Sequence, residues 1–99
     1  MIIVGDIGNT ETKICLVNSK KKIVKRIILN TKKITPVLLK KSLLNFKLKK
    51  KKIIKCLFCS VVPISFSEIK KFLFKMYKIK CYELKALNLN QLIKVKVNY

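Results

Sequence analysis

Histidine and tryptophan are absent from the sequence, and acidic residues are scarce: there are four, against 24 lysines and arginines. Without histidine, and with no second cysteine pair beside Cys56 and Cys59, the sequence lacks the ligands of a four-coordinate zinc site. Cys56 and Cys59 lie in an apolar run that is typical of a strand, where positions three apart point to opposite faces. This spacing disfavours both joint metal binding and a local disulfide, so we expect buried, reduced thiols.

Long hydrophobic runs are also missing. No apolar segment reaches the roughly 20 residues that a membrane-spanning helix needs, because lysines interrupt each one. The apolar start of the chain meets Gly5 and Asp6 too early to be the core of a signal peptide. Hydrophobic residues nevertheless make up 51% of the chain, which is too many for a disordered tail. We therefore expect one small cytoplasmic domain without a membrane partner.

The formal net charge of +20 raises the question of a nucleic-acid or anionic-membrane partner. Arg26 is the only arginine, whereas dedicated nucleic-acid binders usually favour arginine, which contacts phosphate and guanine with two hydrogen bonds. The abundance of lysine, isoleucine and asparagine is typical of an AT-rich genome. We favour this compositional explanation and expect no specific nucleic-acid partner, although nonspecific attraction to polyanions follows from the charge.

The first third of the chain contains three β-rich segments. Residues 1–7 predict a buried strand that ends at Gly8, and residues 12–17 and 23–29 predict two more strands. The loops between them are short, so the three strands are expected to form an antiparallel meander.

The hydrophobic period then becomes helical. Thr35 and Pro36 suit the N-cap and first position of a helix that reaches Leu48, and the lysine run at 49–52 suits its C-terminal end. Residues 53–62 predict a strand buried on both faces, which ends at Pro63.

The remaining segments complete an alternating pattern. Ser65 and Glu68 have the spacing of a capping box, which predicts a helix that continues through Tyr77. Residues 79–84 and 92–97 predict two further strands. The predicted class is α/β: a three-stranded antiparallel meander followed by α-β-α-β.

The turn between the first two predicted strands has the composition of a phosphate-binding loop. Gly8 has no side chain, so backbone N–H groups there can approach phosphate oxygens. Asn9 and Thr10 add side-chain hydrogen bonds, and Lys13 adds a cation. Asp6 cannot bind an anion directly, and its natural role beside phosphate is to hold Mg²⁺, directly or through water. The alternative is an ordinary hairpin turn at Gly8 and Asn9, which has no function.

Three segments in order resemble the type III pantothenate kinases, which belong to the superfamily of actin, sugar kinases and heat-shock ATPases. The first is the Asp-Ile-Gly-Asn-Thr run at 6–10, which resembles the family's first phosphate motif. The second is Cys-Ser-Val-Val-Pro at 59–63, which is similar to the family's Ser-Ser-Val-Val-Pro. The third is the final Ile-Lys-Val-Lys-Val-Asn-Tyr run at 93–99. The resemblance implies a ribonuclease H-like half-domain over residues 1–99.

The resemblance also implies a reaction. Members of the family use ATP to phosphorylate pantothenate to 4'-phosphopantothenate, the first step of coenzyme A biosynthesis, with Mg²⁺ and a monovalent cation (K⁺ or NH₄⁺), and act as homodimers. Tyr99 is implied to contact pantothenate, and Asp6 to hold Mg²⁺. The implied ATP phosphate-binding residues are Asp6, Ile7, Gly8, Asn9, Thr10, Glu11, Thr12 and Lys13.

The sequence departs from the family pattern in its catalytic base. In the family an aspartate in a Gly-Ala-Asp-Arg segment takes the proton of the attacking hydroxyl, and no acidic residue follows Glu83 here. Cys59 also replaces the family's serine. We therefore expect an N-terminal ATPase-type domain that stops before the second catalytic motif and the C-terminal domain, and that is inactive alone. The alternatives are another enzyme or regulator of the superfamily with the same loop, and a small basic nucleic-acid-binding protein.

Overall fold

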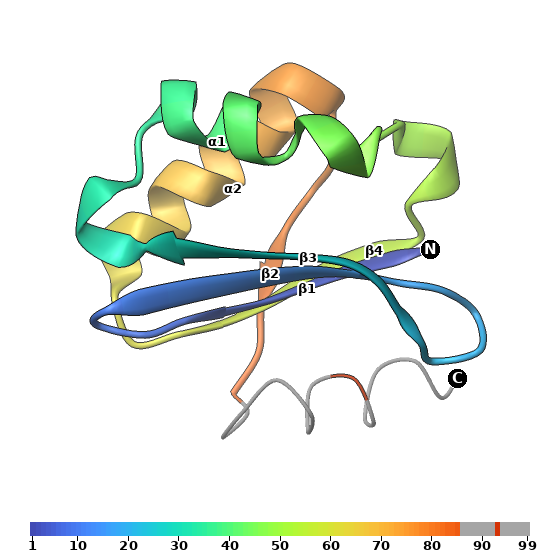
Figure 1. Ribbon diagram of the computed structural model, residues 1–99, viewed down its shortest axis with the longest axis horizontal. Coiled ribbons are helices and arrows are strands. Elements are labelled where there is room, and N and C mark those ends of the chain that lie inside the picture. The colour runs from blue at the N-terminus through green and yellow to red at the C-terminus, as the bar shows by residue number, and fades with distance from the viewer. Residues whose placement is uncertain (86–92, 94–99) are drawn as a thin grey trace.

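A mixed five-stranded sheet carries two helices on one of its faces in the computed structural model, which describes residues 1–85 and Ile93 (Figure 1). The order across the sheet is β3-β2-β1-β4-β5. The strands are β1 (Ile2–Ile7), β2 (Glu11–Val17), β3 (Ile23–Asn30), β4 (Lys55–Ser60) and β5 (Tyr82–Glu83). The helices are α1 (Pro36–Ser42) and α2 (Pro63–Tyr77), with short 3₁₀ turns η1 (Thr31–Lys33), η2 (Leu44–Phe46) and η3 (Lys50–Lys52).

Strand β1 is the centre of the sheet. It pairs antiparallel with β2 and parallel with β4, so both of its edges are hydrogen-bonded to neighbouring strands. Asp6 is the only residue of β1 that is not buried. An apolar strand with one carboxylate near its end is the pattern that the sequence predicts for this segment. The antiparallel order β1-β2-β3 and the following α1-β4-α2-β5 confirm the predicted meander and the alternation after it.

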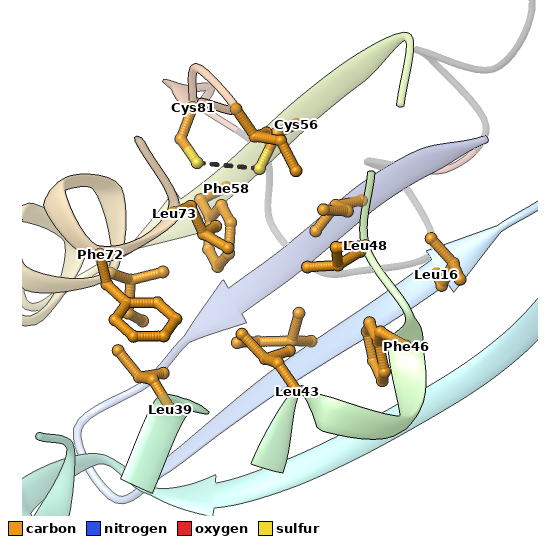
Figure 2. Packing of buried hydrophobic residues seen from close by; sticks show 14 of the residues in the cluster. Leu16, Leu39, Leu43, Phe46, Leu48, Cys56, Phe58, Phe72, Leu73 and Cys81 are labelled. Carbon is orange, nitrogen blue, oxygen red and sulfur yellow. Dashed lines mark hydrogen bonds between the residues drawn. The ribbon is translucent and has the colours of Figure 1, made fainter. Parts of the chain in front are cut away.

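The main core lies between the sheet and the two helices. It joins Leu39 of α1 and Leu73 of α2 to Phe58 of β4, which are all fully buried (Figure 2). Phe58 fits there because it lies directly opposite Gly5 in the register of β1 and β4. A Cβ atom on Gly5 would overlap the Phe58 ring. The glycine is therefore a packing requirement, and it makes room for the largest side chain of the fully buried core.

A second apolar cluster covers part of the opposite face of the sheet. Val4, Cys15 and Leu57 lie at its centre, and Ile93 packs on them with 8% of its surface exposed. Burial raises the pKa of the Cys15 thiol, while a hydrogen bond from Arg26 of β3 opposes that shift. Ile93 is helical, so the predicted strand at 92–97 is wrong at this residue, and its other positions lie outside the described residues.

Two helix predictions are corrected. The first helix begins as expected, with Thr35 as N-cap: its hydroxyl accepts a hydrogen bond from the Leu38 N–H at 3.1 Å. It ends at Ser42, six residues before Leu48, because the chain turns through η2 and Lys47 takes a left-handed conformation (φ 51°). Phe46, in that turn, and Leu48, just after it, both pack on the core (Figure 2).

The capping box is the second correction. Helix α2 begins at Pro63, so Ser65 lies inside its first turn as a buried residue and does not cap it. Proline at the first helical position has no N–H to satisfy, and the N-cap residue is Val62, which makes no side-chain cap. The predicted strand at 79–84 is shorter than expected, with β5 limited to Tyr82 and Glu83.

The cysteines lie as the strand pattern predicts. Cys56 points into the main core, whereas Cys59 is half-buried and lies three positions along β4. Cys56 instead meets Cys81, with the two Sγ atoms 2.9 Å apart (Figure 2). Both thiols are free and buried. Burial and the Cys81 thiol raise the pKa of Cys56 well above its ordinary value of 9.0, which keeps it protonated.

Candidate phosphate-binding site

The turn between β1 and β2 forms one wall of a hollow of about 320 Å³. It lies at the end of the sheet where β1 and β4 finish, which is the left end in Figure 1. Each of its lining residues belongs to the predicted phosphate-binding segment: Asp6, Gly8, Thr10, Glu11 and Lys13. The sequence pattern therefore corresponds to a real concavity rather than to a flat hairpin tip.

The turn itself is tight. Ile7 and Thr12 are the last paired residues of the two strands, and the Gly8 N–H donates to the Glu11 carbonyl at 2.9 Å. Asn9 and Thr10 form the exposed tip. No backbone hydrogen bond within the described part of the chain uses the N–H of Asn9 or Thr10, so both donors are available to an anion. A Cβ on Gly8 would lie 3.2 Å from the Glu11 carbonyl oxygen, which would crowd the turn.

Asp6 and Lys13 lie side by side on one face of the sheet. They are directly paired across β1 and β2, and Cys59 is paired with Asp6 on the other side, in β4. Side chains at paired positions share a face, so carboxylate, ammonium and thiol form a row beside the turn. Asp6 and Lys13 are both half-buried. Among residues 1–85 no hydrogen bond or ion pair engages the Asp6 carboxylate, so its oxygens are open toward the hollow.

The remaining residues of the predicted segment take other positions. Ile7 and Thr12 are fully buried on the opposite face of the sheet, where Ile7 is part of the main core. Asn9 lies at the exposed tip, next to the hollow but not in its lining. Tyr99, the predicted pantothenate contact, lies outside the described residues. The structure thus brings five of the predicted residues together and places Ile7 and Thr12 behind them.

A residue that the sequence pattern does not reveal completes the turn. Thr31, the first residue of η1, donates its hydroxyl to the Gly8 carbonyl at 2.8 Å and its N–H to the Thr10 carbonyl at 2.9 Å. The hydroxyls of Thr31 and Thr12 are also 2.8 Å apart. Thr31 is about 20 positions from the turn in sequence, and only the pairing of β2 with β3 brings it there. A threonine at a strand end carries no local signal of such a contact.

The connection from β4 to α2 lies at the same edge. The Val61 N–H donates to the Ile7 carbonyl at 3.0 Å, and the Ser60 hydroxyl hydrogen-bonds to both backbone groups of Val62 at 3.0 Å. Helix α2 then runs away from this edge on the core face of the sheet, so the positive end of its dipole lies at the same end of the sheet as the hollow. The lining of the hollow itself carries the Lys13 ammonium and the carboxylates of Asp6 and Glu11.

Metal binding by protein ligands alone has little support. Within residues 1–85 and Ile93, no group of three or more acidic, cysteine or histidine side chains is placed to hold a metal ion. Asp6 and Glu11 are the two carboxylates at the hollow. One or two carboxylates suit Mg²⁺ when phosphate oxygens and water complete its shell.

No helix in the described part of the chain is long and apolar enough to cross a membrane.

Two comparisons with known proteins give the same family. A family model described as type III pantothenate kinase matches residues 2–99. The type III pantothenate kinase of Pelagibacter ubique is 71% identical over 99 residues, which is all of this chain. The chain spans 40% of the length of that relative.

Among solved structures, a Porphyromonas gingivalis protein assigned as an N-acetylglucosamine kinase is similar, with a TM-score of 0.59 at 22% identity. The match covers 84% of this chain and 33% of the other. At that identity the likeness concerns the fold alone, and it confirms the expected α/β architecture.

Proposed function

Because the chain belongs to the type III pantothenate kinase family, we propose that it carries the ATP phosphate-binding half of an enzyme that phosphorylates pantothenate to 4'-phosphopantothenate. The observation that carries this proposal is the hollow at the β1–β2 turn, which five of the predicted phosphate-binding residues line. The reaction, the first step of coenzyme A biosynthesis, belongs to the whole enzyme. Residues 1–99 supply its N-terminal ATPase-type domain.

The proposed roles follow from the chemistry of phosphoryl transfer, in which a protein mostly positions the reactants and neutralises charge. The free N–H groups of Asn9 and Thr10 bind phosphate oxygens at the tip of the turn. The Thr10 hydroxyl lines the same hollow and adds a hydrogen bond, and the Lys13 ammonium offsets negative charge. Gly8 keeps the turn narrow enough for the backbone to approach the anion.

The residues present fit a magnesium ion that accompanies the nucleotide. Asp6 is half-buried at the hollow, and its carboxylate has no partner within residues 1–85, so it is available as a ligand, directly or through water. When bound, Mg²⁺ supplies charge neutralisation at the phosphates. Asp6 holds its oxygens toward that position, and the neighbouring Lys13 offsets one of the two carboxylate charges that line the hollow. We further propose, from family membership, a monovalent cation (K⁺ or NH₄⁺).

The general base and the pantothenate contact are proposed to lie outside residues 1–85. Within the described part of the chain, the hollow offers no carboxylate beyond Asp6 and Glu11, and Asp6 has the metal role. A general base must reach the hydroxyl of pantothenate, so we propose that it lies in a segment corresponding to the rest of the family's length. Tyr99 is proposed to contact pantothenate. A homodimer and a cytoplasmic location are also proposed on family grounds.

A titration of the 99-residue chain with MgATP tests the proposal. We expect Asp6→Asn to weaken MgATP binding about tenfold, because it removes a charged ligand. Glu68→Gln, a carboxylate change on α2 outside the hollow, is the matched control and should leave the affinity unchanged. Equal MgATP affinity in the Asp6→Asn variant would contradict the metal role.

The same preparation tests whether the chain is a half-site. With pantothenate added, the 99-residue chain should form no phosphopantothenate above the background of a heat-denatured sample. Steady turnover that depends on Asp6 would mean that residues 1–99 contain the base, and the division of roles proposed above would be wrong.

A further inference from the structure

Thr31 forms hydrogen bonds to the backbone of the β1–β2 turn, the phosphate loop at residues 8–11. Its hydroxyl donates to the Gly8 carbonyl and its N–H donates to the Thr10 carbonyl, so one residue of η1 holds two carbonyls of the turn. The Thr31 hydroxyl proton is used by Gly8, and the short contact to Thr12 therefore has Thr12 as the donor. The result is a directed chain of hydroxyls that runs from Thr12 through Thr31 to the turn.

This chain is shielded from water. Thr12 is fully buried and Thr31 is 5% exposed, so water has little access to replace either hydroxyl hydrogen bond. Buried hydroxyls without partners are unfavourable, and each of these two has its partner in the other and in Gly8. The arrangement therefore holds the Gly8 carbonyl in one orientation.

The direction of the carbonyls decides the direction of the amides. In a trans peptide the C=O and the following N–H point opposite ways, and the described residues contain no cis peptide. Because the Gly8 carbonyl points at Thr31, the Asn9 N–H points away from it. Thr12 and Thr31 lie on one side of the turn, whereas the Asp6 and Lys13 side chains lie on the opposite face, where the hollow is.

We propose that Thr31, supported by Thr12, is a positioning residue of the phosphate loop: its hydroxyl, bonded to the Gly8 carbonyl, aims the Asn9 N–H at a phosphate group beside the hollow, and its N–H holds the Thr10 carbonyl at the other end of the turn. This inference rests on the proposed function, since it names the residue that prepares the loop for its ligand. Thr31 does not touch the ligand itself. Its effect is exerted through the backbone of the turn, which is set before the ligand arrives.

The test compares Thr31→Val, which keeps the shape and removes the hydroxyl, with Thr31→Ser, which keeps the hydroxyl. The 99-residue chain is titrated with MgATP and with magnesium tripolyphosphate, and binding is followed at the Asn9 amide by NMR. A residue-resolved signal is needed because a chain with a net charge of +20 attracts polyanions at many lysines. The carbon-13 shift of the Gly8 carbonyl reports the hydrogen bond in the absence of any ligand.

We expect Thr31→Val to raise the dissociation constant at the loop about tenfold and to move the Gly8 carbonyl signal. Thr31→Ser should bind within about twofold of the unmodified chain. Thr35→Val is the matched control, because it removes another hydrogen-bonded threonine hydroxyl, at the N-cap of α1, and should lower the melting temperature without weakening loop binding. If Thr31→Val melts below the assay temperature, Thr12→Val replaces it, with an expected loss of about threefold.

The outcomes separate the inference from the proposed function. Absence of binding at the Asn9 amide in the unmodified chain contradicts the proposed function. Binding in the unmodified chain with the same dissociation constant in the valine variants overturns the positioning role and leaves the proposed function intact. An unmoved Gly8 carbonyl signal in Thr31→Val overturns the hydrogen bond on which the inference is built.

Discussion

At the scale of single residues, the two glycines of the chain have different tasks. Gly5 makes room for the Phe58 ring in the core, while Gly8 narrows the turn at the hollow. Neither takes a positive φ, so the absence of a side chain matters more than conformational freedom. Gly8 lies in the first motif and Gly5 just before it, and only Gly8 lines the hollow.

Gly5→Ala should lower the free energy of unfolding by about 3 kcal/mol, because the added methyl overlaps the Phe58 ring in a packed core. Urea denaturation measures the change. The double variant Gly5→Ala/Phe58→Leu should recover part of the loss, since the smaller side chain leaves space. Gly8→Ala should cost less stability, as its methyl would meet only the Glu11 carbonyl oxygen, at 3.2 Å. A neutral effect of Gly5→Ala would show that the ring can move aside.

At the scale of elements, the sequence predicted what depends on local pattern. The strands β1, β2 and β3, the N-cap at Thr35 and the turn at Gly8 all follow from alternation, capping and turn chemistry between near neighbours. The family match shows that the chain belongs to the type III pantothenate kinases, while the phosphate-binding role of the turn stays a prediction.

Tertiary contacts account for what the sequence did not predict. The first helix stops at Ser42 because burial of Phe46 and Leu48 outweighs the helical pattern there. The predicted strand at 53–62 is shortened to β4, which ends at Ser60, and Pro63 starts α2 with Ser65 buried inside that helix. Thr31 reaches the turn only through the register of β2 and β3, which no local pattern encodes.

The contact between β4 and the segment after α2 gives a pH-dependent prediction. Cys56 is protonated in the fold because burial and the Cys81 thiol raise its pKa well above 9.0, whereas in the unfolded chain it ionises near 9. The contribution of Cys56 to the free energy of unfolding is therefore fully present below about pH 9. It falls as the pH rises above 9, by up to about 1.4 kcal/mol per pH unit.

Urea unfolding between pH 7 and 10.5 measures this loss. Cys56→Ala should reduce the decline above pH 9, while Cys59→Ala, which changes the half-buried thiol near the other end of β4, should retain it. The comparison of the two variants removes every contribution to the decline that they share. Identical declines in both variants would contradict the assignment to Cys56.

At the scale of the whole molecule, charge opposes folding. The chain carries 24 cations against four acids, so their mutual repulsion is larger in the compact state than in the unfolded chain. Raising NaCl from 50 to 500 mM shortens the range of that repulsion and should raise the melting temperature by about 5 °C. Circular dichroism follows the transition.

A charge variant provides the control for the salt prediction. Lys50→Glu/Lys51→Glu changes two exposed residues of η3, lowers the net charge, and should reduce the salt effect. A melting temperature that does not depend on salt would mean that the lysines are spaced widely enough for water alone to screen them.

Two of the cations, Lys25 and Arg26, lie on an edge strand of the sheet. Strand β3 is one border, and Lys25 and Arg26 lie in its middle, while the other border, β5, is two residues long. Unpaired strand edges invite other chains to add strands, and charged or very short edges discourage it. In the described part of the chain, the excess of lysine that weakens folding therefore also protects against edge-to-edge aggregation. Replacing Lys25 and Arg26 by glutamate would keep that protection, whereas replacing them by isoleucine would remove it.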